Sequence, residues 1–172
     1  MELRFILPNL RRLDLAGTEV LVAGITEDER PLRGLAGLLD FRLQGKLSKL
    51  LASGFISGRF GELLLLPGKP ALAFDKLILV GLGSRGTFGD NTYRHALSRI
   101  LTTLEGIRVR SAVVELPGRH FFSMRPEDAT SILLEMVADR PDHDLWTLVE
   151  SNEAQQAISQ QVLNDRRRQR KL

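Results

Sequence analysis

Short apolar runs alternate with longer amphipathic stretches along the 172 residues of this chain. Such alternation is typical of an α/β domain, in which helices pack on a sheet. The strands it predicts are residues 4–7, 20–25, 62–66, 76–82, 111–116 and 145–150. Residues 62–66 and 76–82 are almost continuously apolar, which indicates that both faces of each strand are covered. Both are therefore predicted to be central strands.

Apolar residues at helical spacing predict about four helices between these strands. The first has its firm part at residues 38–53, with Gly54 suited to its C-terminal cap. The second follows the capping candidates Asp90 and Asn91 and ends near residue 106. Helices beginning at Pro126 and after a cap at Asn152 complete the set. Strands and helices in this order predict a mixed, about six-stranded sheet with helices on both faces.

Composition fits one ordinary globular domain, with 43% hydrophobic and 26% charged residues. The chain has no cysteine, which excludes disulfides and thiolate chemistry and gives no sign of an oxidising compartment. Neither a secretory signal nor an apolar run long enough to span a bilayer is visible. We therefore expect a cytoplasmic protein without membrane contact, with a domain at residues 1–165 and a basic tail at residues 166–172.

One ordered set of residues carries a family resemblance. Its members are Leu39-Asp40 with Gly45 five residues later, Gly54-Phe55 leading to Gly58 and Gly61-Glu62, the leucine-rich strand, and Val80-Gly81-Leu82-Gly83. The set covers roughly half of the chain and resembles the N-terminal domain of leucyl aminopeptidases. This resemblance implies a macro-domain-like, three-layer α/β/α fold. It also implies that catalysis belongs to a separate C-terminal domain with two metal ions, whose Asn-Thr-Asp-Ala-Glu-Gly-Arg motif does not occur here.

A glycine-rich turn after the strand at residues 76–82 is the first candidate ligand site. Backbone N–H groups around Gly81, Gly83, Ser84 and Gly86, together with the Arg85 side chain, could hold a phosphate. Its spacing fits neither the dinucleotide fingerprint nor a P-loop. Macro domains bind ADP-ribose at such strand ends, but the acidic segment at residues 24–30 departs from their pattern. Turn geometry is the favoured interpretation.

The loop after the strand at residues 111–116 is the second candidate. Gly118, Arg119 and His120 lie where the resemblance places a diphosphate-covering loop, so Arg119 and His120 could contact an anion. The favoured interpretation is that Phe121 and Phe122 anchor a surface loop in which Arg119 and His120 are solvated. The other histidines are weaker candidates, because His95 lies off the apolar helix stripe and His143 needs metal-ligand partners from elsewhere. No metal site, nucleophile or cofactor is predicted.

The only strongly basic cluster is at the C-terminus. Its members are Arg166, Arg167, Arg168, Arg170 and Lys171. These residues could bind nucleic acid non-specifically through phosphates, an activity that some aminopeptidases of the family have. The remainder of the chain is slightly acidic and the tail lacks stacking aromatics, so a solvated helix end is favoured.

Three functional hypotheses follow. The leading one is a non-catalytic module for protein interaction or assembly, whose partner is a second copy or an aminopeptidase-type protein. The resemblance supports it, because in the family this domain helps to build the hexamer. The second is a macro-type binder of a nucleotide or phosphorylated small molecule such as ADP-ribose. The third is a remnant or subunit of a metal-dependent leucyl aminopeptidase, with residual peptidase or ADP-ribosyl hydrolase activity.

Overall fold

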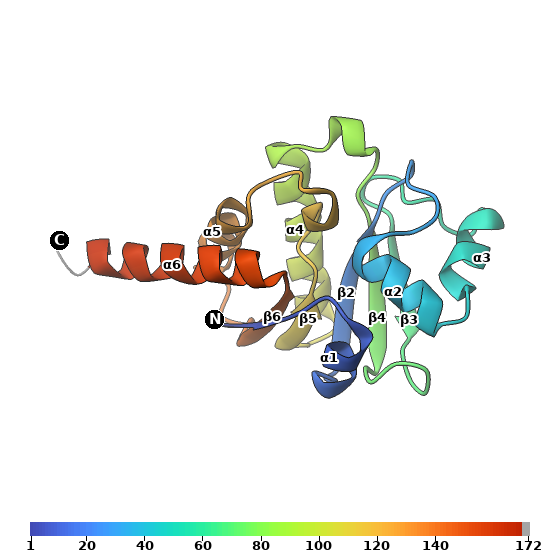
Figure 1. Ribbon diagram of the computed structural model, residues 1–172, viewed down its shortest axis with the longest axis horizontal. Helices are drawn as coiled ribbons and strands as arrows, with labels where there is room; N and C mark the ends of the chain where they lie inside the picture. The colour runs from blue at the N-terminus through green and yellow to red at the C-terminus, as the bar shows by residue number, and fades with distance from the viewer. Residues whose placement is uncertain (170–172) are drawn as a thin grey trace.

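A computed structural model describes residues 1–169 as a sheet of six strands with helices on both faces (Figure 1). The strands are β1 (Glu2–Ile6), β2 (Val20–Ile25), β3 (Leu63–Pro67), β4 (Lys76–Gly81), β5 (Ser111–Val114) and β6 (Leu145–Val149). The helices are α1 (Leu10–Leu15), α2 (Gly34–Arg42), α3 (Lys46–Ala52), α4 (Asp90–Gly106), α5 (Pro126–Val137) and α6 (Asn152–Gln169), with short 3₁₀ turns at Arg85–Thr87 and Arg119–Phe121. The predicted α/β/α class with a mixed sheet is confirmed.

Strand order across the sheet is β1-β6-β5-β2-β4-β3. Every neighbouring pair is parallel except β3 with β4, which is antiparallel. The carboxyl ends of the five parallel strands therefore lie at one edge of the sheet, where open α/β folds usually place their ligands. The turns that follow β2, β4, β5 and β6 meet at this edge.

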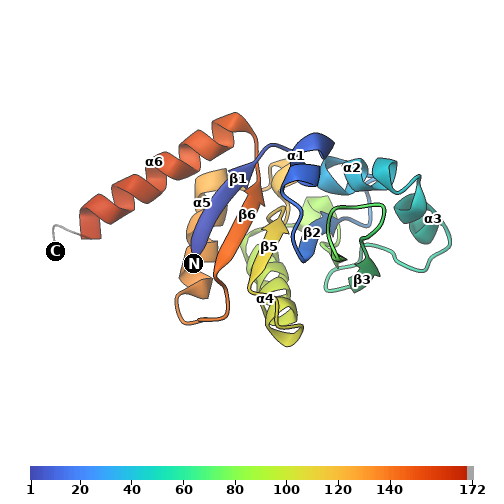
Figure 2. The same ribbon diagram turned by 90° about the horizontal axis from the view of Figure 1, so that it is seen from below.

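Two hydrophobic cores hold the three layers together, one on each face of the sheet (Figure 2). Alternate residues of β2 divide between them, since Val20 and Val22 face α4 and α5 while Leu21 and Ala23 face α1, α2 and α3. Trp146 of β6 is fully buried in the first core. Burial on both faces explains why these central strands read as continuous apolar runs.

The predicted single helix at residues 38–53 is wrong, because the chain forms two helices there. Gln44 and Gly45 both adopt positive φ angles, of 54° and 77°, which no α-helix accommodates. Gly45 permits this conformation without a side-chain penalty, so α2 ends and α3 begins at this point. The short helix α1 was not predicted, and the structure has six α-helices within its described residues rather than about four.

The prediction that β3 is a central strand is also wrong. β3 occupies an edge of the sheet, and Leu65 in its middle is 47% exposed. Its leucine run resembles that of a buried strand because the neighbouring residues still pack on the two cores. Two predicted caps also differ: Gly89 rather than Asp90 or Asn91 precedes α4, and the Ser151 hydroxyl accepts the hydrogen bond at the start of α6.

Candidate functional site

Buried acidic residues gather at the carboxyl edge of the sheet. Glu115 directly follows β5, Glu150 directly follows β6, and the turn after β2 carries Glu29. All three are buried, although carboxylates rarely are unless they are paired. Two basic residues of the loop after β5, Arg119 and His120, lie among them. These five residues are called the edge cluster below.

His120 lies between two carboxylates of the edge cluster. Its Nε2 atom is 2.9 Å from Oε2 of Glu29, and its Nδ1 atom is 3.4 Å from Oε2 of Glu115. Burial favours the neutral imidazole, but hydrogen bonds and charge attraction from Glu115 and Glu29 outweigh it and raise the pKa of His120. A protonated imidazole donates from both nitrogens, so it suits a position with an acidic group on each side.

Arg119 forms the other buried ion pair of the edge cluster. Its Nε and Nη2 atoms donate to the two carboxylate oxygens of Glu150, at 2.7 and 3.1 Å, and its Nη1 donates to the Met124 carbonyl. This is a bidentate pairing of a planar guanidinium with a carboxylate. Nearby, the buried Tyr93 hydroxyl donates to the Ala129 carbonyl at 2.7 Å, and burial raises the pKa of this phenol. The Arg119–Glu150 ion pair connects the loop after β5 to the end of β6.

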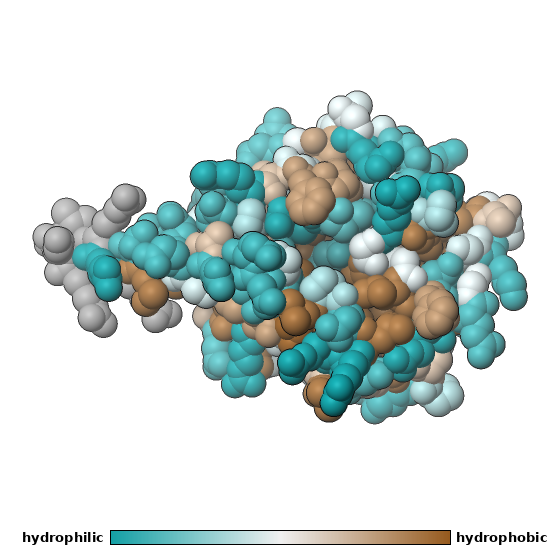
Figure 3. Space-filling view, in the orientation of Figure 1, coloured by the Kyte–Doolittle hydropathy of each residue, from teal (hydrophilic) through white to brown (hydrophobic). Residues whose placement is uncertain are grey.

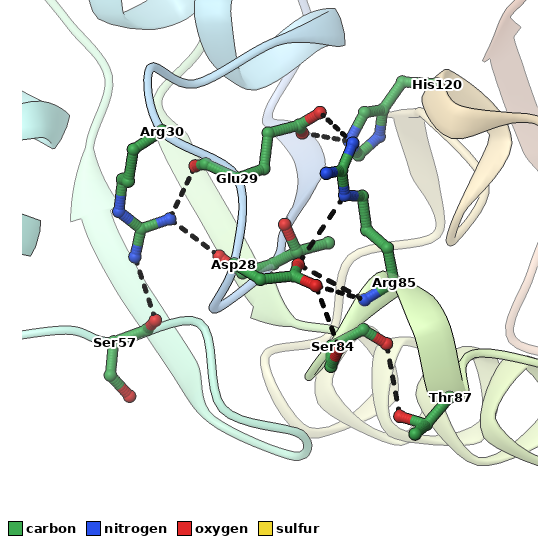
Figure 4. A network of polar contacts seen from close by, with 9 residues as sticks. Asp28, Glu29, Arg30, Ser57, Ser84, Arg85, Thr87 and His120 are labelled. Carbon is green, nitrogen blue, oxygen red and sulfur yellow. Dashed lines mark hydrogen bonds and ion pairs between the residues drawn. The ribbon is translucent and has the colours of Figure 1, made fainter.

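The glycine-rich turn after β4 already holds an anion from the protein itself (Figure 4). Ser84 Oγ donates to the Asp28 carboxylate at 2.9 Å, and the Arg85 backbone N–H donates to it at 3.1 Å. The Ser84 hydrogen bond, joined by those of Arg85, holds the pKa of Asp28 below its usual range. The Arg85 side chain lies 3.3 Å from Oε1 of Glu29, so it connects this turn to the edge cluster.

Two other sets of backbone N–H groups at the same edge also carry internal carboxylates. At the start of α2, the Leu35 N–H donates to Oε1 of Glu115 at 3.0 Å. In the loop before β3, the N–H groups of Ser57 and Gly58 donate to Oε2 of Glu62, at 2.9 and 2.6 Å. Together with Asp28, these carboxylates occupy the kind of position in which backbone N–H groups bind anions.

The predicted glycines serve the geometry of their turns. A side chain at Gly81 would overlap the Arg59 carbonyl, and Gly83 and Gly118 have positive φ angles of 73° and 74°. Gly86 lies beside a cavity of about 370 Å³. The lining of this cavity is Asp28, Arg85, Gly86, Phe88, Phe121 and Ser123. The two predicted loops therefore meet at this cavity, whose lining includes one basic and one acidic side chain.

The favoured prediction that Arg119 and His120 are solvated is wrong. Both side chains are buried, because the acidic residues at the strand ends neutralise them. Phe122, predicted as an anchor, is instead 82% exposed. Phe121 is partly buried, and its ring packs edge-on against Phe88 and His120. Ion pairs rather than a pair of aromatic rings hold this loop.

The remaining histidines and the tail stay outside the site. His95 is exposed as predicted, whereas His143 is buried with its Nε2 atom 3.1 Å from Oε1 of Glu105. Among residues 1–169, no group of three or more His, Asp or Glu side chains is placed to hold a metal ion. Arg167 is exposed on α6, and the side chains of Arg166 and Arg168 are not described. Arg170 and Lys171 lie outside the described residues.

The acidic partners in the site were not predicted from the sequence as functional residues. A usable signal was present for Glu115 and Glu150, because each is an acidic residue at or near the end of an apolar run predicted as a strand, and the structure ends β5 and β6 directly before them. Side chains in that position converge at one edge of the sheet. The sequence alone did not reveal which basic residue would pair with which carboxylate, since Arg119 and Glu150 are 31 positions apart and His120 and Glu29 are 91 positions apart.

No helix in the described part of the chain is long and apolar enough to cross a membrane.

Residues 20–140 match the model of the N-terminal domain of the cytosol aminopeptidase family. The chain is 37% identical over 99 residues to a probable cytosol aminopeptidase of Pseudomonas fluorescens, covering 58% of this chain and 20% of that protein. It is 31% identical over 122 residues to the cytosol aminopeptidase of Pseudomonas aeruginosa, covering 71% and 24%. It therefore spans less than a quarter of the length of these relatives.

Solved structures share the fold at low sequence identity. A mutant tomato leucine aminopeptidase aligns with a TM-score of 0.62 and 16% identity, covering 94% of this chain and 35% of that one. The macrodomain of Thermus aquaticus DarG aligns with a TM-score of 0.64 and 15% identity, covering 87% and 99%. A mutant Oceanobacillus iheyensis macrodomain with ADPR gives 0.67 and 13%, covering 88% and 89%. The predicted macro-domain-like architecture is confirmed.

Proposed function

Because this chain belongs to the cytosol aminopeptidase family through that family's N-terminal domain, we propose that it is a non-catalytic module for protein interaction and assembly. Its partner is a second copy of the chain or an aminopeptidase-type protein, and the name of the cytosol aminopeptidase relative supports a place in the cytoplasm. One observation carries this proposal: the anion-binding positions at the carboxyl edge of the sheet hold the protein's own carboxylates.

A phosphate ligand would have to displace these groups. To reach the start of α2 it would replace Glu115, which also neutralises His120. Breaking a buried ion pair typically costs about 3–5 kcal/mol, and each 1.4 kcal/mol lowers an affinity about tenfold. A macro-type ligand would thus lose a factor of roughly 100 to 4,000 in affinity relative to an open cleft. This argues for a closed, structural role of the edge cluster.

Exposed apolar side chains favour a protein partner. Leu15 of α1 and Phe41 of α2 are 75% and 79% exposed, and Phe55 after α3 is also exposed. Figure 3 shows apolar surface gathered over α1 and α2 on this face, surrounded by hydrophilic residues. Large apolar and aromatic side chains on a rigid scaffold are typical anchors of protein interfaces.

Size-exclusion chromatography with light scattering, together with pull-down on a full-length cytosol aminopeptidase, tests the proposal. We expect either self-association or capture of the aminopeptidase, and Phe41→Ser should weaken capture of the aminopeptidase at least tenfold. Leu163→Ser on α6 is the control, because it removes a 50% exposed apolar side chain from a helix other than α1 and α2. A protein that remains monomeric and captures no aminopeptidase would contradict the proposed function.

A second candidate function is the binding of a phosphorylated small molecule in the cavity of about 370 Å³ beside Arg85 and Gly86. The favouring observation is that the Arg85 side chain is 43% exposed there. Calorimetric titration with ADP-ribose and with ADP tests this candidate, with Arg85→Met as the variant. No heat at millimolar ligand is the result expected from the closed cluster, and micromolar binding abolished by Arg85→Met would establish the second candidate instead.

The enzymatic hypothesis requires a separate assay. We expect no hydrolysis of a leucine chromogenic substrate with added Mn²⁺ or Zn²⁺, because residues 1–169 hold no group of acidic and histidine side chains placed for a metal ion. Turnover that remains with the protein through purification would overturn the non-catalytic assignment.

A further inference from the structure

The edge strand β3 has one side without a neighbour. It pairs with β4 alone, in the register Leu64↔Leu79 and Leu66↔Leu77. The Gly81 N–H donates to the Glu62 carbonyl and the Gly68 N–H donates to the Asp75 carbonyl. In an antiparallel ladder every second residue of a strand bonds to the same neighbour. Positions 62 and 68 bond to the β4 side, so residues 64 and 66 between them also bond to β4. The N–H and C=O groups of residues 63 and 65 therefore point away from the sheet.

Little protects this edge from pairing. Residues 63–67 are four leucines and a proline, with no charge and no interruption in their register with β4. Natural proteins usually protect such edges with charged residues, bulges or prolines. The opposite edge of this sheet follows that rule, because β1 carries the exposed, mutually paired Glu2 and Arg4. On β3 only Pro67, at the end of the strand, opposes pairing.

We propose that β3 pairs antiparallel with β3 of a second copy of this chain, around a two-fold axis through Leu64. The proposal rests on the proposed assembly function and specifies the contact between two copies of the chain. In this register residue 63 of each copy lies opposite residue 65 of the other, so both outward-facing residues exchange N–H and C=O hydrogen bonds. Pro67, which has no N–H, lies outside this central set. The contact is isologous, as two-fold dimers require.

The same register also places the side chains favourably. Leu63 and Leu65 lie on one face of β3, and Leu63 packs against the core beneath α4. Leu65, which is 47% exposed, would lie beside Leu63 of the second copy and lose much of its exposure. Pairing places no like charges opposite each other between residues 63 and 67. This self-complementarity favours a second copy over a peptide of unrelated sequence.

The absence of native cysteine makes the register directly testable. Leu64 of one copy faces Leu64 of the other as a non-hydrogen-bonded pair, at about 4.5 Å between Cα atoms. Leu64→Cys should therefore form an intermolecular disulfide under mild oxidation. Residue 65 of one copy lies opposite residue 63 of the other, so the Cα atoms of the two Leu65→Cys residues would be about 7–8 Å apart. This distance is too long for a disulfide. Leu163→Cys on α6, similarly exposed, reports random collision.

We expect Leu64→Cys to cross-link at least tenfold faster than the other two variants. Equal cross-linking of Leu65→Cys or Leu163→Cys would overturn the register. Since Leu64 is partly buried, Leu65→Lys gives an independent measurement on a side chain with space around it. It should weaken the dimer at least tenfold by sedimentation, whereas Leu163→Lys should not. A dimer insensitive to Leu65→Lys would overturn pairing through β3.

Failure of this inference can be told apart from failure of the proposed function. A chain that remains monomeric at millimolar concentration but captures an aminopeptidase overturns β3 self-pairing and leaves the assembly function in place. A dimer that cross-links outside β3, or a heterologous strand bound at this edge in place of a second copy, does the same. A monomer that captures nothing overturns both.

Discussion

The carboxylate of Glu115 accepts a hydrogen bond from the backbone N–H of Leu35, 80 residues earlier in the chain. One oxygen of this carboxylate thereby satisfies a free N–H group in the first turn of α2, while the other lies 3.4 Å from His120. A single side chain at the end of β5 thus fixes both the start of a helix and the charge of a buried imidazole. The carboxyl edge of the sheet is closed by these contacts.

Removal of the Glu115 carboxylate should therefore destabilise the fold. Glu115→Ala leaves the Leu35 N–H without its acceptor and His120 with one acidic partner instead of two. We expect a loss of about 3 kcal/mol in the free energy of unfolding, measured by urea denaturation. Glu135→Ala, which removes an exposed carboxylate paired with Arg94, is the control and should change stability little. Equal effects of the two substitutions would contradict this account.

Stability should also depend on pH through His120. Its pKa is raised above the ordinary value of 6.5, so its protonated form stabilises the folded state fully below about pH 6.5. This contribution is lost as pH rises through the folded-state pKa, because a neutral imidazole no longer offsets Glu29 and Glu115. Above pH 6.5 the wild type should lose stability relative to His120→Gln, whereas exposed His95→Gln should follow the wild type. If the free energy of unfolding of wild type and of His120→Gln changed with pH in parallel, this role of His120 would be excluded.

Much of the fold could be predicted from local pattern. The apolar runs located all six strands, and burial on both faces explains why the central strands leave a signal in consecutive residues. Patterns of this kind do not specify strand order, so the leucine run of β3 indicated a central strand although it lies at an edge. The helix break at Gln44 was missed for a related reason. Gln44 has a positive φ although it is not glycine, and the spacing of apolar residues carries no signal for such an angle.

The candidate site was predictable in position but not in chemistry. Both loops chosen from the sequence, at residues 81–86 and 117–120, do meet at the carboxyl edge, where Arg85 and His120 both pair with Glu29. The burial of Arg119 and His120 could not be predicted, because it depends on Glu150 and Glu29, which reach this loop from the turns after β6 and β2. A basic loop residue with no visible partner is most simply expected to be solvated, and tertiary pairing reversed that expectation.

Loss of one partner of the buried Arg119–Glu150 pair should be severe. Arg119→Met leaves the Glu150 carboxylate buried and unpaired, which typically costs about 3–5 kcal/mol. The double variant Arg119→Met/Glu150→Leu removes both charges and should recover most of that loss, measured as urea midpoints in a double-mutant cycle. Arg125→Met, which disrupts an exposed pair with Asp128, is the control. Additive effects in the cycle would show that the two residues act independently.

Substitution of two glycines with positive φ can distinguish steric overlap with the edge cluster from the cost of backbone strain alone. Gly34 and Gly45 have φ angles of 59° and 77°, so alanine is strained at both. A Cβ atom at Gly45 meets nothing within 4 Å, whereas one at Gly34 overlaps the His120 side chain and lies 3.1 Å from Oε1 of Glu115. Gly45→Ala should cost about 1 kcal/mol, the conformational term alone.

Gly34→Ala should cost clearly more, about 3 kcal/mol, because α2 or His120 must move. The displacement should also change the NMR titration of His120, since its contacts with Glu29 and Glu115 depend on that position. Gly45→Ala should leave the titration unchanged. If both alanines cost the same and neither alters the His120 titration, the packing of α2 against the edge cluster is looser than the distances indicate. The start of α2 would then not depend on the buried ion pairs.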